Sequence, residues 1–323
     1  MRACNRIRSC VGSFWNNQPA PGWGHADLAT SDVWGGWGRD DRVTCLFRLT
    51  EAKKALDPKD LERIVKNIAF YDKRAINIKD LMIELIRGSS LADSEVLHAL
   101  DLLASWDNLS VDADGDGFYD HPGATIFDRW WSKIVAATFD DEFEGYKNVF
   151  GQTAVQILSN RYHGYTLFYK ALQGKSKVDY FNGRKAEIIQ KSLKETLSEL
   201  ALEQPDKKVG EYRLKTAMDS FHPVTVLGYF LQQPITSSVG ELAQFPKVDR
   251  GTENHIVNLE LGAITGVNIT APGTSGFISQ SGERGKHFDD QVQMFVNFKY
   301  KPMLFYQDAV RGSAEASTVV EQD

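Results

Sequence analysis

The spacing of hydrophobic residues changes twice along this chain of 323 residues, and this change constrains the fold more than any single motif does. From about residue 57 to about residue 205, apolar residues recur every three or four positions, as they do in amphipathic helices. Residues 13–50 and those after Pro246 carry short apolar runs broken by glycine and proline, which indicate strands and ordered loops. We therefore predict an α+β fold, with a long helical block between N-terminal and C-terminal strands.

Start and stop signals divide the helical block into separate helices. Asp57 and Pro58 form an N-cap followed by proline at the first helical position, so a helix should begin there. Gly88 should end the second helix, and Gln204 with Pro205 should end the last and longest one. The helices after the first are expected over residues 78–87, 93–106, 124–138, 155–172 and 185–203.

The chain is predicted to return to strands between about residues 250 and 306. Residues 289–296 fit neither a helical nor a strand period, so a helix and a strand both stay open there. Residues 311–323 are small and polar, and we expect this tail to fray. The predicted strands cover residues 255–261, 266–271 and 301–305.

Charge and composition exclude two classes of partner. The net charge is −6, and acidic and basic residues are interleaved without a lysine- or arginine-rich patch, so we expect no nucleic-acid partner. Apolar runs stay well short of the roughly 18 residues that a membrane helix needs, so we expect no membrane partner. Cys4, Cys10 and Cys45 lack metal-ligand spacing and are expected to be free thiols. Residues 1–12 differ in composition from the rest and are interpreted as an artefactual start.

The sharpest local pattern is an acidic loop. Its carboxylates occupy positions 1, 3, 5 and 9 of an EF-hand-type calcium loop, and Gly117 occupies position 6, where the chain must turn sharply. Position 12 holds Gly123 instead of the glutamate that would bind calcium through both oxygens. The pattern predicts a structural calcium site, and the alternative is an acidic loop that only faces solvent. The carboxylates belong to Asp112, Asp114, Asp116 and Asp120.

Two segments near the N-terminus carry side chains suited to catalysis. The carboxamide of Asn16 or Asn17 can donate hydrogen bonds to a developing oxyanion, or the pair can form a turn before Pro19. Arg42 can hold a carboxylate through two hydrogen bonds, or it can form a surface ion pair with an adjacent aspartate. No serine lies in a G-x-S-x-G motif. The residues alone leave these alternatives open.

Several segments resemble the penicillin G acylase family. They contain rare residues and follow one another in the family's order, which makes the resemblance specific. It covers about residues 13–310, so residues 1–12 and the polar tail 311–323 are unmatched. The segments are WNNQP at 15–19, ATIFDRWW at 124–131, RGTEN at 250–254, APGTSGFI at 271–278 and KHFDDQ at 286–291.

The resemblance implies part of an αββα N-terminal-nucleophile hydrolase, with this chain as the C-terminal part of the large subunit. Members of the family cut themselves into a small and a large subunit. The new N-terminal serine then attacks the amide with its own α-amino group as base. The expected reaction cleaves N-acyl side chains of phenylacetyl type from penicillin-like or other amides. The serine, the rest of the large subunit and the small subunit are expected upstream of Trp15, as partners without which the chain is inactive.

The resemblance also assigns roles to single residues. It implies that Asn16 lies in the oxyanion hole, that Arg42 positions the substrate, and that Asp27 is a ligand of the family's structural calcium. The acidic loop would then be a second calcium site. The family is exported, so a periplasmic or secreted location is expected. Two alternatives are a fragment of an acyl-homoserine-lactone acylase and a non-catalytic calcium-loop protein derived from an acylase.

Overall fold

The computed structural model describes residues 9–11, 46, 49–51, 53–89, 92–143, 164–221, 243–246, 253–275, 279, 281 and 283–318. The described residues form two compact units. The helical unit contains those from Phe70 to Ala217, and the strand unit contains those up to Ala69 and those from Met218 onward.

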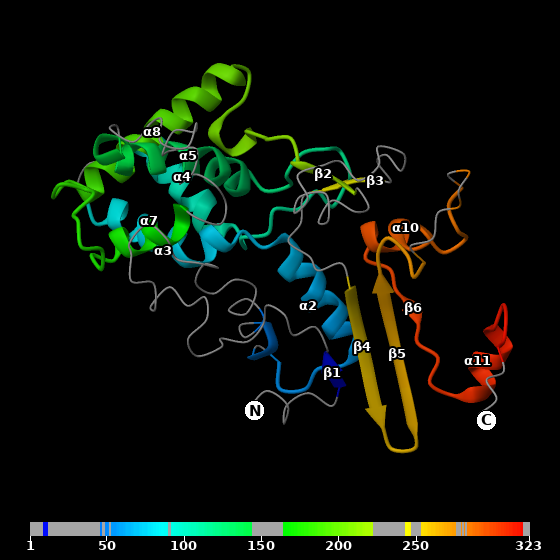
Figure 1. Ribbon diagram of the computed structural model, residues 1–323. Helices are drawn as coiled ribbons and strands as arrows, with labels where there is room; N and C mark the ends of the chain where they lie inside the picture. Colours follow the sequence, from blue (N-terminus) through cyan, green and yellow to red (C-terminus); the bar gives the residue numbers. More distant parts are fainter. Residues whose placement is uncertain are drawn as a thin grey trace. The chain divides into compact units, whose positions relative to one another are not determined.

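The described part of the helical unit consists mainly of α-helices (Figure 1). α5 packs along α8, and α4 packs against both α3 and α5. The last helix is followed by a short 3-10 helix, η3, at Val209–Glu211. The α-helices are α3 (Lys73–Arg87), α4 (Ser94–Ser105), α5 (Pro122–Phe143), α7 (Gly164–Leu172) and α8 (Lys185–Glu203).

The predicted helices are present, with some shifted ends. α8 has the predicted bounds, but α5 has 22 residues against 19 in α8, so the prediction that the last helix is the longest is wrong. α3 begins at Lys73, earlier than residue 78, because the Asp72 carboxylate accepts hydrogen bonds from the backbone N–H groups of Arg74 and Ala75. The early part of the predicted helix over 155–172 lies outside the described residues, which contain α7 from Gly164.

An aromatic cluster fills the core of the helical unit. Trp130 and Trp131 of α5 are at most 2% exposed. Trp131 meets Phe168 of α7 edge to face, with ring centroids 5.6 Å apart. The Trp130 indole N–H donates to the Ser192 hydroxyl of α8 at 2.8 Å. Burial of such side chains stabilises the fold by roughly 1.5–3 kcal/mol each. α5 is therefore held to both α7 and α8, and this fixes its first turn beside the acidic loop.

The start of α5 approaches the end of α4 closely. A Cβ atom on Gly123 would lie 2.7 Å from the Cβ of Trp106 and 2.8 Å from the carbonyl oxygen of Leu102. Both distances are far below an ordinary contact, so any side chain at residue 123 would push the two helices apart. Helix packing thus explains why glycine, and not glutamate, occupies position 12 of the acidic loop.

The described part of the strand unit contains a four-stranded antiparallel sheet in the order β1-β4-β5-β6 (Figure 1). β4 and β5 form a hairpin in which Ile256 faces Val267, and its turn uses Gly262 at a φ of +86°. β2 and β3 form a separate two-stranded ladder. The strands are β1 (Ser9–Val11), β2 (Met218–Phe221), β3 (Ala243–Pro246), β4 (Glu253–Glu260), β5 (Ala263–Thr270) and β6 (Lys301–Pro302).

The first two predicted C-terminal strands are confirmed as β4 and β5, which the structure pairs as a hairpin, and three details differ from the prediction. The segment left open between helix and strand forms a short helix, α10 (Val292–Val296). The closing strand covers only β6, shorter than the predicted 301–305. A helix that was not predicted, α11 (Gln307–Ser313), includes residues 311–313, which were expected to belong to the fraying tail.

The first predicted helix is also confirmed, as α2 (Pro58–Phe70). Its Asp60 carboxylate accepts a hydrogen bond from the Asp57 backbone N–H at 3.1 Å, while the Asp57 carboxylate accepts one from the Asp60 N–H at 2.8 Å. These reciprocal bonds satisfy N–H groups at the start of the helix. Among the helices in the described ranges, none has the length and apolar character required to cross a membrane.

Candidate functional site

The predicted site residues divide into two groups. Asn16, Asp27 and Arg42 lie outside the described residues, so their roles stay predictions. The acidic loop between α4 and α5 lies entirely within the described residues.

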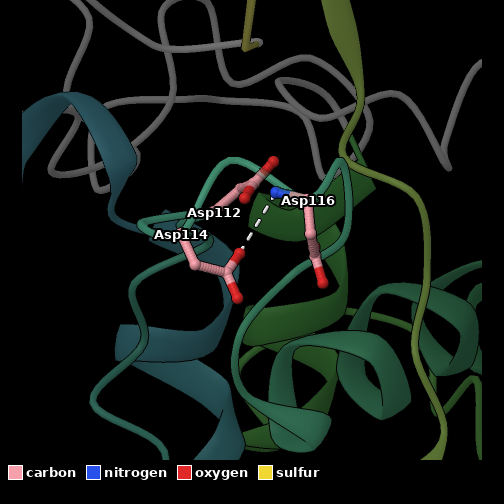
Figure 2. Close-up of side chains that lie close together, drawn as sticks. All are labelled: Asp112, Asp114 and Asp116. Carbon is pink, nitrogen blue, oxygen red and sulfur yellow. Dashed lines mark hydrogen bonds between the residues drawn. The ribbon is translucent and has the colours of Figure 1, made fainter.

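Three of the four predicted carboxylates meet in this loop. Asp112, Asp114 and Asp116 each offer a carboxylate oxygen, and these oxygens lie within 4.8 Å of one another (Figure 2). Asp120 is used differently, because its carboxylate accepts the backbone N–H of Ala113 at 3.0 and 3.2 Å. The structure therefore brings together positions 1, 3 and 5 of the predicted calcium loop, while position 9 closes the loop by a hydrogen bond.

Backbone N–H groups and two glycines shape this acidic loop. The Gly117 N–H donates to Asp112 Oδ2 at 2.9 Å. The Asp116 N–H donates to Asp114 Oδ1 at 3.1 Å (Figure 2). Gly115 and Gly117 have φ angles of +75° and +86°, which side-chain-bearing residues rarely adopt. The loop thus curls around its own carboxylates, as an oxygen-rich cation loop does.

A segment about a hundred positions further along the chain braces the loop. The Arg213 guanidinium donates to both carboxylate oxygens of Asp116, at 2.6 and 3.3 Å, and lies 5.6 Å from the centroid of the Phe118 ring. The Thr216 hydroxyl donates to Asp112 Oδ2 at 3.2 Å. Sequence reasoning missed both partners, because no local pattern links them to the loop.

One oxygen of the loop lacks a partner in the described structure. Asp112 Oδ1 is shielded from solvent and accepts no hydrogen bond from any described residue. A buried carboxylate oxygen without a donor is costly, and a bound cation would satisfy it. The donor set consists of oxygens, which suits calcium. Arg213 already neutralises Asp116, so the residues fit an ion held mainly by Asp112 and Asp114.

Two further titratable side chains, Lys79 and His121, lie near the ends of the loop and were not singled out from the sequence. Lys79 is 3% exposed and donates to the carbonyl oxygen of Trp106 at 2.6 Å. Burial lowers the pKa of Lys79. Burial also lowers the pKa of His121, whose Nδ1 accepts the Gly123 N–H at 2.9 Å. The two side chains thus provide hydrogen-bond partners for the Trp106 carbonyl oxygen after α4 and for the Gly123 N–H in the first turn of α5, which is a structural role.

Two of the sequence motifs in the strand unit pack against each other. The Ser275 N–H donates to the carbonyl oxygen of His287 at 2.9 Å, and the Gln291 N–H donates to that of Pro272 at 3.0 Å. A Cβ atom on Gly273 would lie only 2.2 Å from the His287 carbonyl oxygen, so this position requires glycine. The motifs at 271–275 and 286–291 therefore form one structural element beside the end of β5.

Comparison with known proteins gives a consistent result. A family model described as Penicillin amidase matches residues 11–312. Penicillin G acylase of Escherichia coli is 25% identical over 327 residues, covering 95% of this chain and 37% of that protein. A thermostable penicillin G acylase from Alcaligenes faecalis has a TM-score of 0.72 at 22% identity, over 96% of this chain and 56% of that one. This likeness establishes the fold alone, and the chain spans roughly a third to a half of these relatives' length.

Proposed function

The chain belongs to the penicillin amidase family, and from this membership we propose that it is part of an N-terminal-nucleophile amide hydrolase. In this proposal it forms the C-terminal part of the large subunit, and its strands contribute to an αββα sandwich. The substrate is an N-acyl amide, of the phenylacetyl type found in penicillins. The observation that carries the proposal is the family match over residues 11–312.

The proposed reaction proceeds through an acyl-enzyme on a serine outside these 323 residues. The serine hydroxyl attacks the amide carbonyl, and its own α-amino group accepts the proton. The Asn16 side chain donates a hydrogen bond to the oxyanion of the tetrahedral intermediate, and Arg42 positions the substrate. Expulsion of the amine leaves an ester on the serine, which water then hydrolyses to the carboxylic acid.

The proposed partners are the remaining part of the large subunit and the small subunit. They supply the nucleophile, a backbone donor of the oxyanion hole and the pocket for the acyl group. We also propose that the assembled enzyme works outside the cytoplasm, in the periplasm or secreted, as its family resemblance implies.

Hydrolysis of a chromogenic phenylacetyl anilide tests this assignment. The purified chain should show no turnover alone, because the attacking hydroxyl is elsewhere. Turnover should appear after co-expression with the polypeptide encoded by the DNA ahead of Met1. Turnover by the isolated chain that disappears in the Asn16→Ala variant would overturn the proposal.

We further propose that the acidic loop binds one calcium ion, separate from the ion that Asp27 would help to hold. The close carboxylates of Asp112 and Asp114 and the unpartnered Asp112 oxygen support this proposal. The ion would tie the connection between α4 and α5 to the braced segment at Thr216, and its role would be structural.

Isothermal calorimetry of the calcium-stripped chain tests the loop. We expect one site with a Kd of about 10⁻⁴ to 10⁻³ M, as in other modest-affinity calcium modules. Asp114→Asn should weaken binding about ten-fold because it removes one ligand charge, and Arg213→Met should tighten it because it frees Asp116.

A matched control for the calcium experiment is Asp101→Asn, which alters an exposed carboxylate that pairs with Arg87 in the same unit. This variant should bind calcium as the parent does. Equal binding by Asp101→Asn and Asp114→Asn, or no heat with the parent, would contradict a calcium site in the acidic loop.

A further inference from the structure

His287 lies between two carboxylates that come from different segments of the strand unit. Its Nδ1 is 2.7 Å from Asp290 Oδ2, within the same turn. Its Nε2 is 3.3 Å from the carboxylate of Glu315, which follows α11. Lys286 also pairs with Glu315. The residues after α11 are therefore joined to the turn before α10 through a single glutamate.

The chemistry of the imidazole ring decides when both contacts can form. A neutral imidazole carries one N–H, so its other nitrogen presents a lone pair to whatever faces it. A carboxylate facing that lone pair is repelled, whereas the imidazolium ion donates to both carboxylates at once. The observed geometry, with a carboxylate oxygen at each ring nitrogen, is that of the protonated ring.

Little else in the described structure anchors this part of the chain by burial. α11 has no buried residue, and the residues from Ala314 to Thr318 are exposed. Upstream of α11, the Met303 N–H donates to the Gly266 carbonyl oxygen at 2.8 Å, and the Tyr306 hydroxyl accepts the Ile264 N–H at 2.7 Å. The position of the chain after α11 consequently depends on its polar contacts at Glu315.

We propose that His287 is a proton-controlled latch that holds the chain segment at Glu315 against the turn before α10, closed when the ring is protonated and weakened when it is neutral. The other charged groups at this place are Lys286 and the ion pair between Arg284 and Asp289. Lys286 keeps one contact to Glu315 after the ring loses its proton, so the latch loosens without releasing completely.

The direction of the pH dependence follows from the hydrogen bonds. The contacts to Asp290 and then Glu315 raise the pKa of His287 above its ordinary value of 6.5. The protonated His287 ring therefore contributes fully to holding the segment at Glu315 below pH 6.5, and this contribution is lost as the pH rises through the raised pKa. Lys286 and then His287 lower the pKa of Glu315 below its ordinary 4.5, so that contribution is present above pH 4.5 and is lost only in stronger acid.

A nitroxide spin label on the chain after α11 tests the latch. The label is attached to Ser317→Cys in the full chain, with Cys4, Cys10 and Cys45 changed to serine. Its electron paramagnetic resonance spectrum reports the ratio of mobile to immobile label. We expect this ratio to rise about two- to five-fold between about pH 5.5 and about pH 8.5, the change expected for one exposed charged contact.

Three variants distinguish the titration of His287 from the titration of other groups. His287→Gln does not titrate and should remove the pH dependence, whereas Asp290→Asn should move the midpoint to lower pH and keep the segment docked in acid. His98→Gln, which changes an exposed histidine of α4, should behave as the parent does. A parent spectrum that does not change with pH, or a His287→Gln variant that keeps the parent's profile, would overturn the proposal.

Discussion

Replacement of Asn16 by alanine should lower kcat of the assembled enzyme about 100- to 1,000-fold, with little change in KM. In the proposed mechanism its carboxamide N–H meets the substrate oxygen most strongly once that oxygen has become an oxyanion. Loss of one such donor costs roughly 3–4 kcal/mol in the transition state. Because the contribution arises mainly in the transition state, it appears in kcat. Steady-state kinetics with a phenylacetyl anilide measure both constants.

Asn17 supplies a matched control for this experiment, since it is the adjacent residue with the same side chain. The Asn17→Ala variant should keep kcat within about three-fold of the parent, because only one of the two carboxamides is assigned to the oxyanion. A large loss in Asn17→Ala together with near-parent activity in Asn16→Ala would reverse the assignment. Activity at the parent level in both variants would show that neither asparagine stabilises the oxyanion.

Replacement of Arg74 by alanine should lower the free energy of unfolding by about 3–5 kcal/mol. Arg74 is 7% exposed, and its guanidinium pairs with buried Asp72 and donates to Asp128 at 2.9 Å. Burial alone would lower the pKa of Arg74, but the two carboxylates outweigh this effect and raise it. The guanidinium also lies 5.5 Å from the ring centroids of Phe127 and Trp131. Its removal leaves the Asp72 carboxylate buried without its cation.

Urea unfolding followed by tryptophan fluorescence measures this effect. The control is Arg87→Ala on the same helix, because Arg87 forms an ion pair with Asp101 at 2.6 Å while 44% exposed. Solvent screens that pair, so its loss should cost at most about 1 kcal/mol. Similar losses of stability in the two variants would contradict the prediction that the buried ion pairs of Arg74 stabilise the helical unit more than the exposed ion pair of Arg87 does.

The helices of the two units show which parts of the fold follow from local sequence. α2 and α8 were predicted because a proline or a Gln-Pro pair marks one end and apolar spacing marks the rest. The start of α3 was missed because its first turn buries the charged Arg74, and a buried charge interrupts the apolar pattern from which helices are predicted. α11 has no buried face, so hydrophobic spacing carried no signal for it.

In the candidate site too, the local spacing of residues was predictable and the long-range contacts were not. The spacing of Asp112, Asp114 and Asp116 predicted carboxylates that converge on a cation, and the structure places an oxygen of each within 4.8 Å of the others, while the calcium ion itself stays a prediction. Arg213 and Thr216, which contact the loop, lie about a hundred residues further along the chain. Their position depends on the path of the chain after α8, which a single sequence does not specify. The contact between His287 and Glu315 also joins residues distant in the sequence, so no local pattern predicts it.

The attacking serine of the assembled enzyme can be located directly. The enzyme is treated with phenylmethanesulfonyl fluoride, whose aromatic ring is similar to a phenylacetyl group, and each polypeptide is then weighed intact by mass spectrometry. We predict that activity is lost, that the 323-residue chain keeps its unmodified mass, and that the label lies on the N-terminal serine of the other polypeptide. A label on any serine of this chain, formed in step with the loss of activity, would contradict this prediction.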